Sequence, residues 1–196
     1  MTILLKKIAP VLAVVFALGL VACETPVQTQ KMANLTFGHL KPIRLDVAKI
    51  EVVSHYQPPL RAPNVEHLFP TPPAAALKQW AKDRLRAVGR SGTARLVIVN
   101  AGAVESRLAQ KTGLTATFTK QQSQRYDLAV EARLEITSPI GRGQTSAHAS
   151  RFTTVREDIT LNIRERTWLD LTEALVRDFD VAMEQNMRQH LGRWFK

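Results

Sequence analysis

Hydrophobic residues make up 45% and charged residues 22% of the 196-residue chain, values that are typical of a folded protein and exclude a disordered one. The length fits one domain, or one domain with a tail, and is sufficient to bury a core without disulfides or structural metals. The single cysteine excludes an intramolecular disulfide, and the net charge of +10 indicates a basic protein.

Residues 1–22 have the composition of an export signal. Lys6 and Lys7 provide a positively charged start, and an apolar stretch follows over residues 8–22. This stretch is shorter than the roughly 20 residues that a bilayer-spanning helix needs. The sequence therefore predicts a signal peptide rather than a membrane span.

The segment Leu20-Val21-Ala22-Cys23 ends this stretch and resembles the lipobox of bacterial lipoproteins. The resemblance implies that the Cys23 thiol receives a diacylglycerol, that residues 1–22 are removed, and that Cys23 becomes the N-acylated first residue. Several acyl chains, such as palmitate, make a stable anchor where one chain binds only marginally. The alternatives are an uncleaved signal anchor and an ordinary signal with a chance cysteine.

The mature chain implied by this resemblance would be basic and held at a membrane. Its second residue is Glu24. In lipoproteins of enteric-type bacteria an Asp there favours retention in the inner membrane, so Glu24 favours the outer membrane. A net charge of about +8 would remain after cleavage and would suit anionic lipid headgroups or an acidic partner. The alternative is a basic composition spread over a solvated surface, and we expect no nucleic-acid partner.

Residues 23–41 are polar without a sustained period, so we expect a lipidated flexible tether followed by one globular domain over residues 42–196. The domain is predicted to open with a strand over residues 43–52. Apolar residues alternate in this strand and change phase once, which indicates a bulge near Ala48.

A proline-rich stretch, residues 57–73, must be extended or turn-like because proline fixes φ and lacks a backbone donor. A helix is predicted to follow, with Thr71 as its N-cap, Pro72 as its first residue and Gly89 as its stop. Its buried stripe would consist of Leu77, Trp80, Ala81, Leu85 and Val88.

Three strands are predicted next. Residues 94–104 are apolar at their centre, which indicates an inner strand covered on both faces or nearly so. Residues 126–136 alternate strictly and indicate a strand with one buried face. Residues 139–143 are predicted to form a turn, and residues 144–155 to return as the antiparallel partner.

A long helix is predicted over residues 167–191, with Thr167 and Asp170 in the positions of a capping box. Its buried stripe would be Trp168, Leu171, Leu175, Phe179, Ala182, Met183 and Met187. Beyond it, Trp194 and Phe195 either contact a membrane or a partner, or fold back onto the helix. The predicted order is β-α-β-β-β-α, an α+β fold with two helices on one face of a mainly antiparallel sheet of about four strands.

This order, the lipobox and the proline-rich lead-in together resemble small envelope lipoproteins that assist transport. Examples are the auxiliary lipoprotein of ABC-type lipid transporters and the lipopolysaccharide-assembly lipoprotein. The resemblance is one of architecture, and it implies a non-catalytic accessory or scaffold with an envelope protein partner. The alternative is a periplasmic binding module for an acidic ligand, either a lipid headgroup or a glycan. That module would need arginines converging on a pocket between the helices and the sheet.

The sequence contains no pattern for catalysis or for cofactor binding. Acylation would consume Cys23, and neither a Gly-x-Ser-x-Gly elbow nor a phosphate-binding glycine loop occurs. The histidines lack metal-ligand spacing. His55 and His67 could still meet in space beside Glu66, and the alternative is that both are ordinary loop residues. We expect no catalytic residue, metal or cofactor.

Two groups of residues are candidates for surface contacts. In the loop over residues 109–123, Leu114 and Phe118 lie between Lys111 and Lys120 and could insert into lipid or into a partner's groove. The alternative is a hairpin whose apolar residues return to the core. The densest basic group is a candidate for binding anions or for complementing a helix dipole, and it comprises Arg84, Arg86, Arg90 and Arg95.

Overall fold

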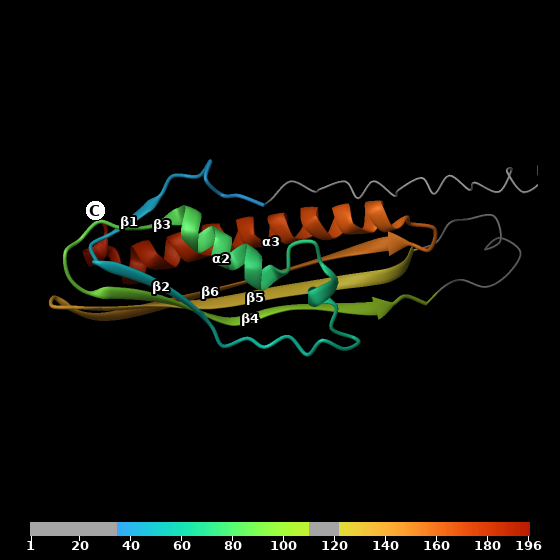
Figure 1. Cartoon of the computed structure of the whole chain (residues 1–196), viewed down its shortest axis with the longest axis horizontal. Coiled ribbons are helices and arrows are strands. Elements are labelled where there is room, and N and C mark those ends of the chain that lie inside the picture. The colour runs from blue at the N-terminus through green and yellow to red at the C-terminus, as the bar shows by residue number, and fades with distance from the viewer. Residues whose placement is uncertain (1–34, 110–121) are drawn as a thin grey trace, which may run out of the picture. The chain divides into compact units, whose positions relative to one another are not determined.

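A computed structural model of the chain describes residues 35–109 and 122–196 (Figure 1). The strands are β1 (Ile43–Leu45), β2 (Lys49–Ser54), β3 (Leu85–Ala87), β4 (Thr93–Arg107), β5 (Gln122–Ser138) and β6 (Gly141–Arg156). The helices are α2 (Pro73–Arg84) and α3 (Leu161–His190), with short 3-10 turns η2 (Glu66–Leu68) and η4 (Gly192–Trp194). The predicted α+β class is confirmed.

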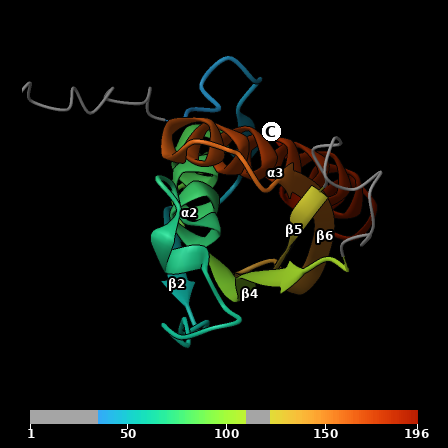
Figure 2. The same ribbon diagram turned by 90° about the vertical axis from the view of Figure 1, so that its right-hand side faces the viewer.

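The main sheet has four strands in the order β2-β4-β5-β6. Strands β4, β5 and β6 are antiparallel neighbours, while β2 pairs with β4 in parallel. Both helices lie on the same face of this sheet in Figure 1, and Figure 2 shows β4, β5 and β6 curving around that side. The 30 residues of α3 span about 45 Å. The helix can therefore cover most of the hairpin formed by β5 and β6, which is about 55 Å long.

Strand β5 confirms the alternation that the sequence shows. Its inward residues are buried, and they are Tyr126, Leu128, Val130, Ala132, Leu134 and Ile136. The hairpin turn to β6 is tighter than predicted, because Ser138 already pairs with Gly141. Gly141 and Gly143, which we expected in the turn, belong to β6.

Strand β4 is an inner strand, as predicted. Val97 alternates with the inward residues and is nonetheless only 2% exposed, so the strand is covered on both faces at that point, and a change of phase extends the apolar run beyond it. The pairing with β5 shifts register between Ile98 and Asn100. Inward positions are even-numbered before this bulge and odd-numbered after it, as buried Leu96 and buried Ala101 show. The bulge changes the phase, and exposed Val99 lies at that point.

The predicted first strand is two strands, and the bulge near Ala48 is wrong. Strand β1 pairs with β3 in a separate two-stranded parallel sheet, whereas β2 joins the main sheet. Between them, the Ala48 N–H donates to the carbonyl oxygens of Ser91 and Gly92 at 3.2 and 3.0 Å. The chain changes sheets here, and this accounts for the change of phase in the apolar pattern.

Helix α2 is shorter than predicted and begins one residue later, with Pro72 as its N-cap. It ends at Arg84, because Leu85 has extended backbone angles and starts β3. Leu85 is buried by pairing in that sheet, while Val88 is 41% exposed and is not part of a helical stripe.

Helix α3 starts earlier than predicted, at Leu161. Its N-cap is Thr160, whose hydroxyl accepts a hydrogen bond from the Ile163 N–H at 3.4 Å. Thr167 lies inside the helix and donates to the Ile163 carbonyl at 2.8 Å, so the predicted capping box is wrong. The buried stripe is confirmed except for Ala182, which is partly buried.

Both ends of the described chain pack onto the domain. Trp194 is 1% exposed, and its indole N–H donates to Ser138 Oγ at 2.8 Å. The C-terminal segment therefore folds back onto the domain, which was the alternative to a contact with a membrane or a partner. Residues 35–41, which we expected in the tether, contribute Phe37, which is 2% exposed. The Phe37 N–H donates to Asp83 Oδ2 at 2.8 Å. The packed part of the chain therefore begins before Pro42.

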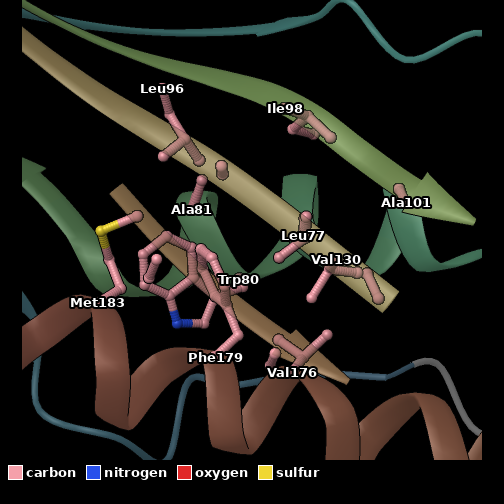
Figure 3. Packing of buried hydrophobic residues seen from close by; sticks show 14 of the residues in the cluster. Leu77, Trp80, Ala81, Leu96, Ile98, Ala101, Val130, Val176, Phe179 and Met183 are labelled. Carbon is pink, nitrogen blue, oxygen red and sulfur yellow. The ribbon is translucent and has the colours of Figure 1, made fainter. Parts of the chain in front are cut away.

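The layer between the helices and the sheet is filled by apolar side chains (Figure 3). Trp80 of α2 and Phe179 of α3 meet edge to face with ring centroids 5.1 Å apart. Side chains from β4 and β5, such as Ile98 and Val130, close the layer from the sheet side and are fully buried. None of the helices in the described residues is long and apolar enough to cross a membrane.

Gly143 of β6 allows the C-terminal segment to dock, and its replacement tests this packing. A Cβ on Gly143 would lie 2.6 Å from Trp194 Cζ3 and 2.7 Å from Leu191 Cδ2. We expect Gly143→Ala to lower the free energy of unfolding by about 1–3 kcal/mol, measured by urea denaturation. Gly192→Ala is the control, because a Cβ there meets nothing within 4 Å. An equal effect of both substitutions would contradict the docking.

Candidate functional site

Several residues singled out in the sequence lie outside the described part of the chain. These are the signal residues, the acylation candidate Cys23 and the loop residues Lys111, Leu114, Phe118 and Lys120. Their assignments remain predictions. The remaining candidates and two cavities lie in the described domain.

The four arginines of the basic group have different surroundings. Arg84 is 3% exposed, and its Nε donates to Asp180 Oδ1 at 2.6 Å. Its Nη2 pairs with Glu184, which lies in helix α3 together with Asp180. The indole N–H of Trp80 donates to the same Asp180 oxygen at 2.7 Å. Arg84 thus connects α2 to α3, and its charge is balanced inside the protein.

The other three arginines lie at the surface. Arg86 donates to the carbonyl oxygens of Lys82 and Leu85 at the end of α2. Arg95 forms an ion pair with Glu51 of the neighbouring strand at 3.2 Å. Arg90 is exposed. Burial of Arg84 separates it from these three, so any anion site formed by the group would use surface residues alone.

Glu66 is the buried acidic residue of the proline-rich region. It is 2% exposed and accepts hydrogen bonds from the Tyr56 hydroxyl at 2.8 Å and from the Ala103 N–H at 3.3 Å. Its carboxylate therefore anchors the proline-rich segment to β4 and is not shared with His55 and His67. In the part of the chain that the structure describes, no group of three or more His, Cys, Asp or Glu side chains is placed to hold a metal ion.

Tyr56 lies at one end of an open trough of about 460 Å³ on the face of the sheet that the helices leave uncovered. Burial and the hydrogen bond to Glu66 raise the pKa of Tyr56 above its usual value, so the phenol stays neutral. Its proton is directed to Glu66, which leaves the phenol oxygen free to accept a further hydrogen bond. In Figure 1 the proline-rich segment passes below the sheet, on the side away from the helices.

The strand register produces the floor of this trough. Gly102, Ala129 and Ser150 are direct neighbours across β4, β5 and β6, so three small residues form one row. A Cβ on Gly102 would lie 3.3 Å from the Tyr56 hydroxyl oxygen. The row is therefore hollowed to the level of the backbone at the end next to Tyr56.

One wall of the trough is the adjacent row, Val104, Asp127 and Phe152. The Arg125 guanidinium lies 3.8 Å from the centre of the Phe152 ring and pairs with Asp127 at 2.6 Å. This hydrogen-bonded pair lowers the pKa of Asp127, which keeps its carboxylate ionised. Phe152 remains 59% exposed, so much of its surface is open to solvent. On the other side of the floor lies Asn100.

Sequence reasoning missed this trough. Phe152 and Asp127 look like ordinary outward residues of two strands, and Tyr56 looks like a residue of a loop. An available signal was the presence of a large aromatic residue among the polar outward positions of residues 144–155. The alignment of Gly102, Ala129 and Ser150 depends on the register and could not be read from any one strand.

A second cavity, of about 310 Å³, lies where β5 and β6 meet the start of α3. Val155, Ile159 and Ile163 supply its apolar lining. Ile163 and nearby Leu161 are 57% and 64% exposed. This end of the domain therefore presents apolar side chains to solvent.

No protein-family model and no curated protein matches the chain. Among solved structures, it is similar to rare lipoprotein B from Shewanella oneidensis, with 10% identity over 70% of this chain and 92% of that one, at a TM-score of 0.34. A minor lipoprotein from Acinetobacter baumannii matches with 13% identity over 76% of this chain and 96% of that one, also at 0.34.

The buried ion pair can be tested against an exposed one on the same helix. Asp180→Ala would leave buried Arg84 with Glu184 as its remaining partner and the Trp80 indole N–H without its acceptor, and we expect it to cost about 3–5 kcal/mol of unfolding free energy. Asp178→Ala removes an exposed pair with Arg151 and should cost at most about 1 kcal/mol. Urea denaturation followed by tryptophan fluorescence measures both. Equal losses would contradict the connecting role of Arg84.

Proposed function

We propose that the chain is a bacterial lipoprotein, held at an envelope membrane by acyl chains on Cys23 and facing the periplasm. The observation that carries this proposal is the placement of Leu20-Val21-Ala22-Cys23 directly at the end of an apolar stretch too short to span a bilayer. Glu24 in the next position favours the outer membrane over the inner one.

We further propose a non-catalytic role as an accessory or scaffold in lipid or lipopolysaccharide transport, or in another envelope complex. The filled layer around Trp80 and Phe179 supports this role, because it leaves contacts with a partner to the surface of the domain. Exposed Leu161 and Ile163 offer apolar area for an envelope protein partner at one end of the domain. Surface arginines would favour approach to anionic lipid.

The alternative role, binding an acidic ligand between the helices and the sheet, has less support. It requires arginines converging on an open pocket. Arg84 reaches this layer, but Asp180 and Glu184 already balance its charge. A ligand there would have to displace both carboxylates and the packed side chains around them.

The anchor is tested by Cys23→Ala. We expect this variant to lose incorporation of labelled palmitate and to leave the membrane fraction or accumulate as an unprocessed chain, because the acyl acceptor is missing. Thr25→Ala is a control that alters the same region without removing the thiol. Normal membrane attachment of the processed Cys23→Ala variant would contradict the proposal.

The loop contact is tested by the double variant Leu114→Asp, Phe118→Asp. If the loop is an exposed contact, the free energy of unfolding should change by no more than about 0.5 kcal/mol, while crosslinking to co-purifying envelope proteins or lipids falls. Thr115→Asp with Thr119→Asp adds the same charge to the same loop and keeps both apolar side chains. A loss of about 2–5 kcal/mol specific to the first variant would show that these residues belong to the core.

A further inference from the structure

The trough on the uncovered face of the sheet lies apart from Leu161 and Ile163, the exposed residues assigned above to a protein partner. Strands β4, β5 and β6 supply its floor and wall, and the segment that begins at Tyr56 lies at one end. The strand register and the hydrogen bond between Tyr56 and Glu66 hold these four segments in place. Its volume of about 460 Å³ lies in the range of small-ligand sites, which is roughly 300–1,000 Å³. The chemistry of its lining indicates the class of ligand.

The charges along the trough are balanced. Arg125 pairs with Asp127 in the wall of the trough, while the side chain of Arg151 is directed to the helix side of β6, where it pairs with Asp178 of α3 at 3.0 Å. An anionic ligand would have to compete with the Asp127 carboxylate for Arg125, and a cationic ligand with the Arg125 guanidinium for Asp127. The lining therefore favours an uncharged ligand.

The apolar surface of the trough is discontinuous. Phe152 and Val104 are 59% and 38% exposed, but Asp127 lies between them in the same row. An acyl chain would have to pass over an ionised carboxylate, which is unfavourable. A ligand with small apolar faces separated by polar groups fits this pattern better.

The polar groups of the lining both donate and accept hydrogen bonds. The Tyr56 oxygen accepts, while the Asn100 amide and the Ser150 hydroxyl can do either. A sugar ring presents hydroxyl groups around its edge and a C–H face that packs on the electron-rich face of an aromatic ring. The Arg125 guanidinium covers one face of the Phe152 ring. We propose that the trough binds a neutral saccharide, with one sugar ring stacked on the other face of Phe152 and its hydroxyl groups directed to Tyr56, Asn100 and Ser150.

The test is a titration of the full-length chain in micelles of a zwitterionic detergent without a sugar headgroup. Chitotriose and maltotriose are the probes. Adenosine is the comparison compound, because it is neutral but would stack on Phe152 through a flat aromatic base. We expect at least one trisaccharide to shift the backbone amide resonances of Gly102 and Ala129 with saturation. If neither does so up to about 10 mM, or if adenosine binds more tightly than both, the proposal is overturned.

Two variants separate the trough from the rest of the surface. Phe152→Ala removes the stacking ring, and Ala129→Leu fills the floor, so each should weaken binding about tenfold or more. Ile140→Ala removes an exposed apolar residue elsewhere, and Thr137→Leu adds the same side chain to the same face of β5 outside the trough. Both controls should bind as the unaltered chain does. Unchanged binding in Phe152→Ala and Ala129→Leu, with unchanged circular dichroism, would overturn the proposal.

Discussion

The ion pair between Arg84 and Asp180 is the contact on which the arrangement of the helices depends. Two charged groups removed from water are stable only when their geometry is good and their remaining hydrogen-bonding positions are occupied. Here the Trp80 indole donates to Asp180 at 2.7 Å, and Glu184 takes up a second guanidinium nitrogen. These bonds allow few relative positions of α2 and α3. The apolar side chains beneath these bonds pack in the arrangement of α2 and α3 that the bonds allow, with Trp80 edge to face on Phe179.

The position of α2 also determines how the chain enters the main sheet. Arg84 is the last residue of the helix, and Leu85 begins β3, which pairs with β1. This small parallel sheet lies outside the main one, so the chain enters the main sheet twice, between β1 and β2 and again between β3 and β4, and leaves it between β2 and β3. The main sheet is left with one face packed on the helices and one face open to solvent. The inner face carries the apolar layer, and the outer face carries the trough lined by Tyr56 and Phe152.

Parts of this structure follow directly from local pattern. The alternation of β5 and the apolar stripe of α3 each repeat over many residues, and both predictions are confirmed. Predictions failed where tertiary contacts overrode the pattern. Leu85 continues the helical stripe in the sequence but pairs in a strand, and Thr167 has the position of a cap but lies inside a longer helix that Thr160 caps.

The sequence by itself determined the types and approximate extents of the main elements, and it identified Cys23 as the candidate for acylation. Both follow from periodicity and motif, which are properties of neighbouring residues. Only the tertiary structure decided that Arg84 is buried and paired, because its partner lies 96 residues away. It likewise decided that Gly102, Ala129 and Ser150 share one row, because a shift of register by one residue would turn each side chain to the other face. Burial and register depend on contacts between distant segments, and no single segment contains that information.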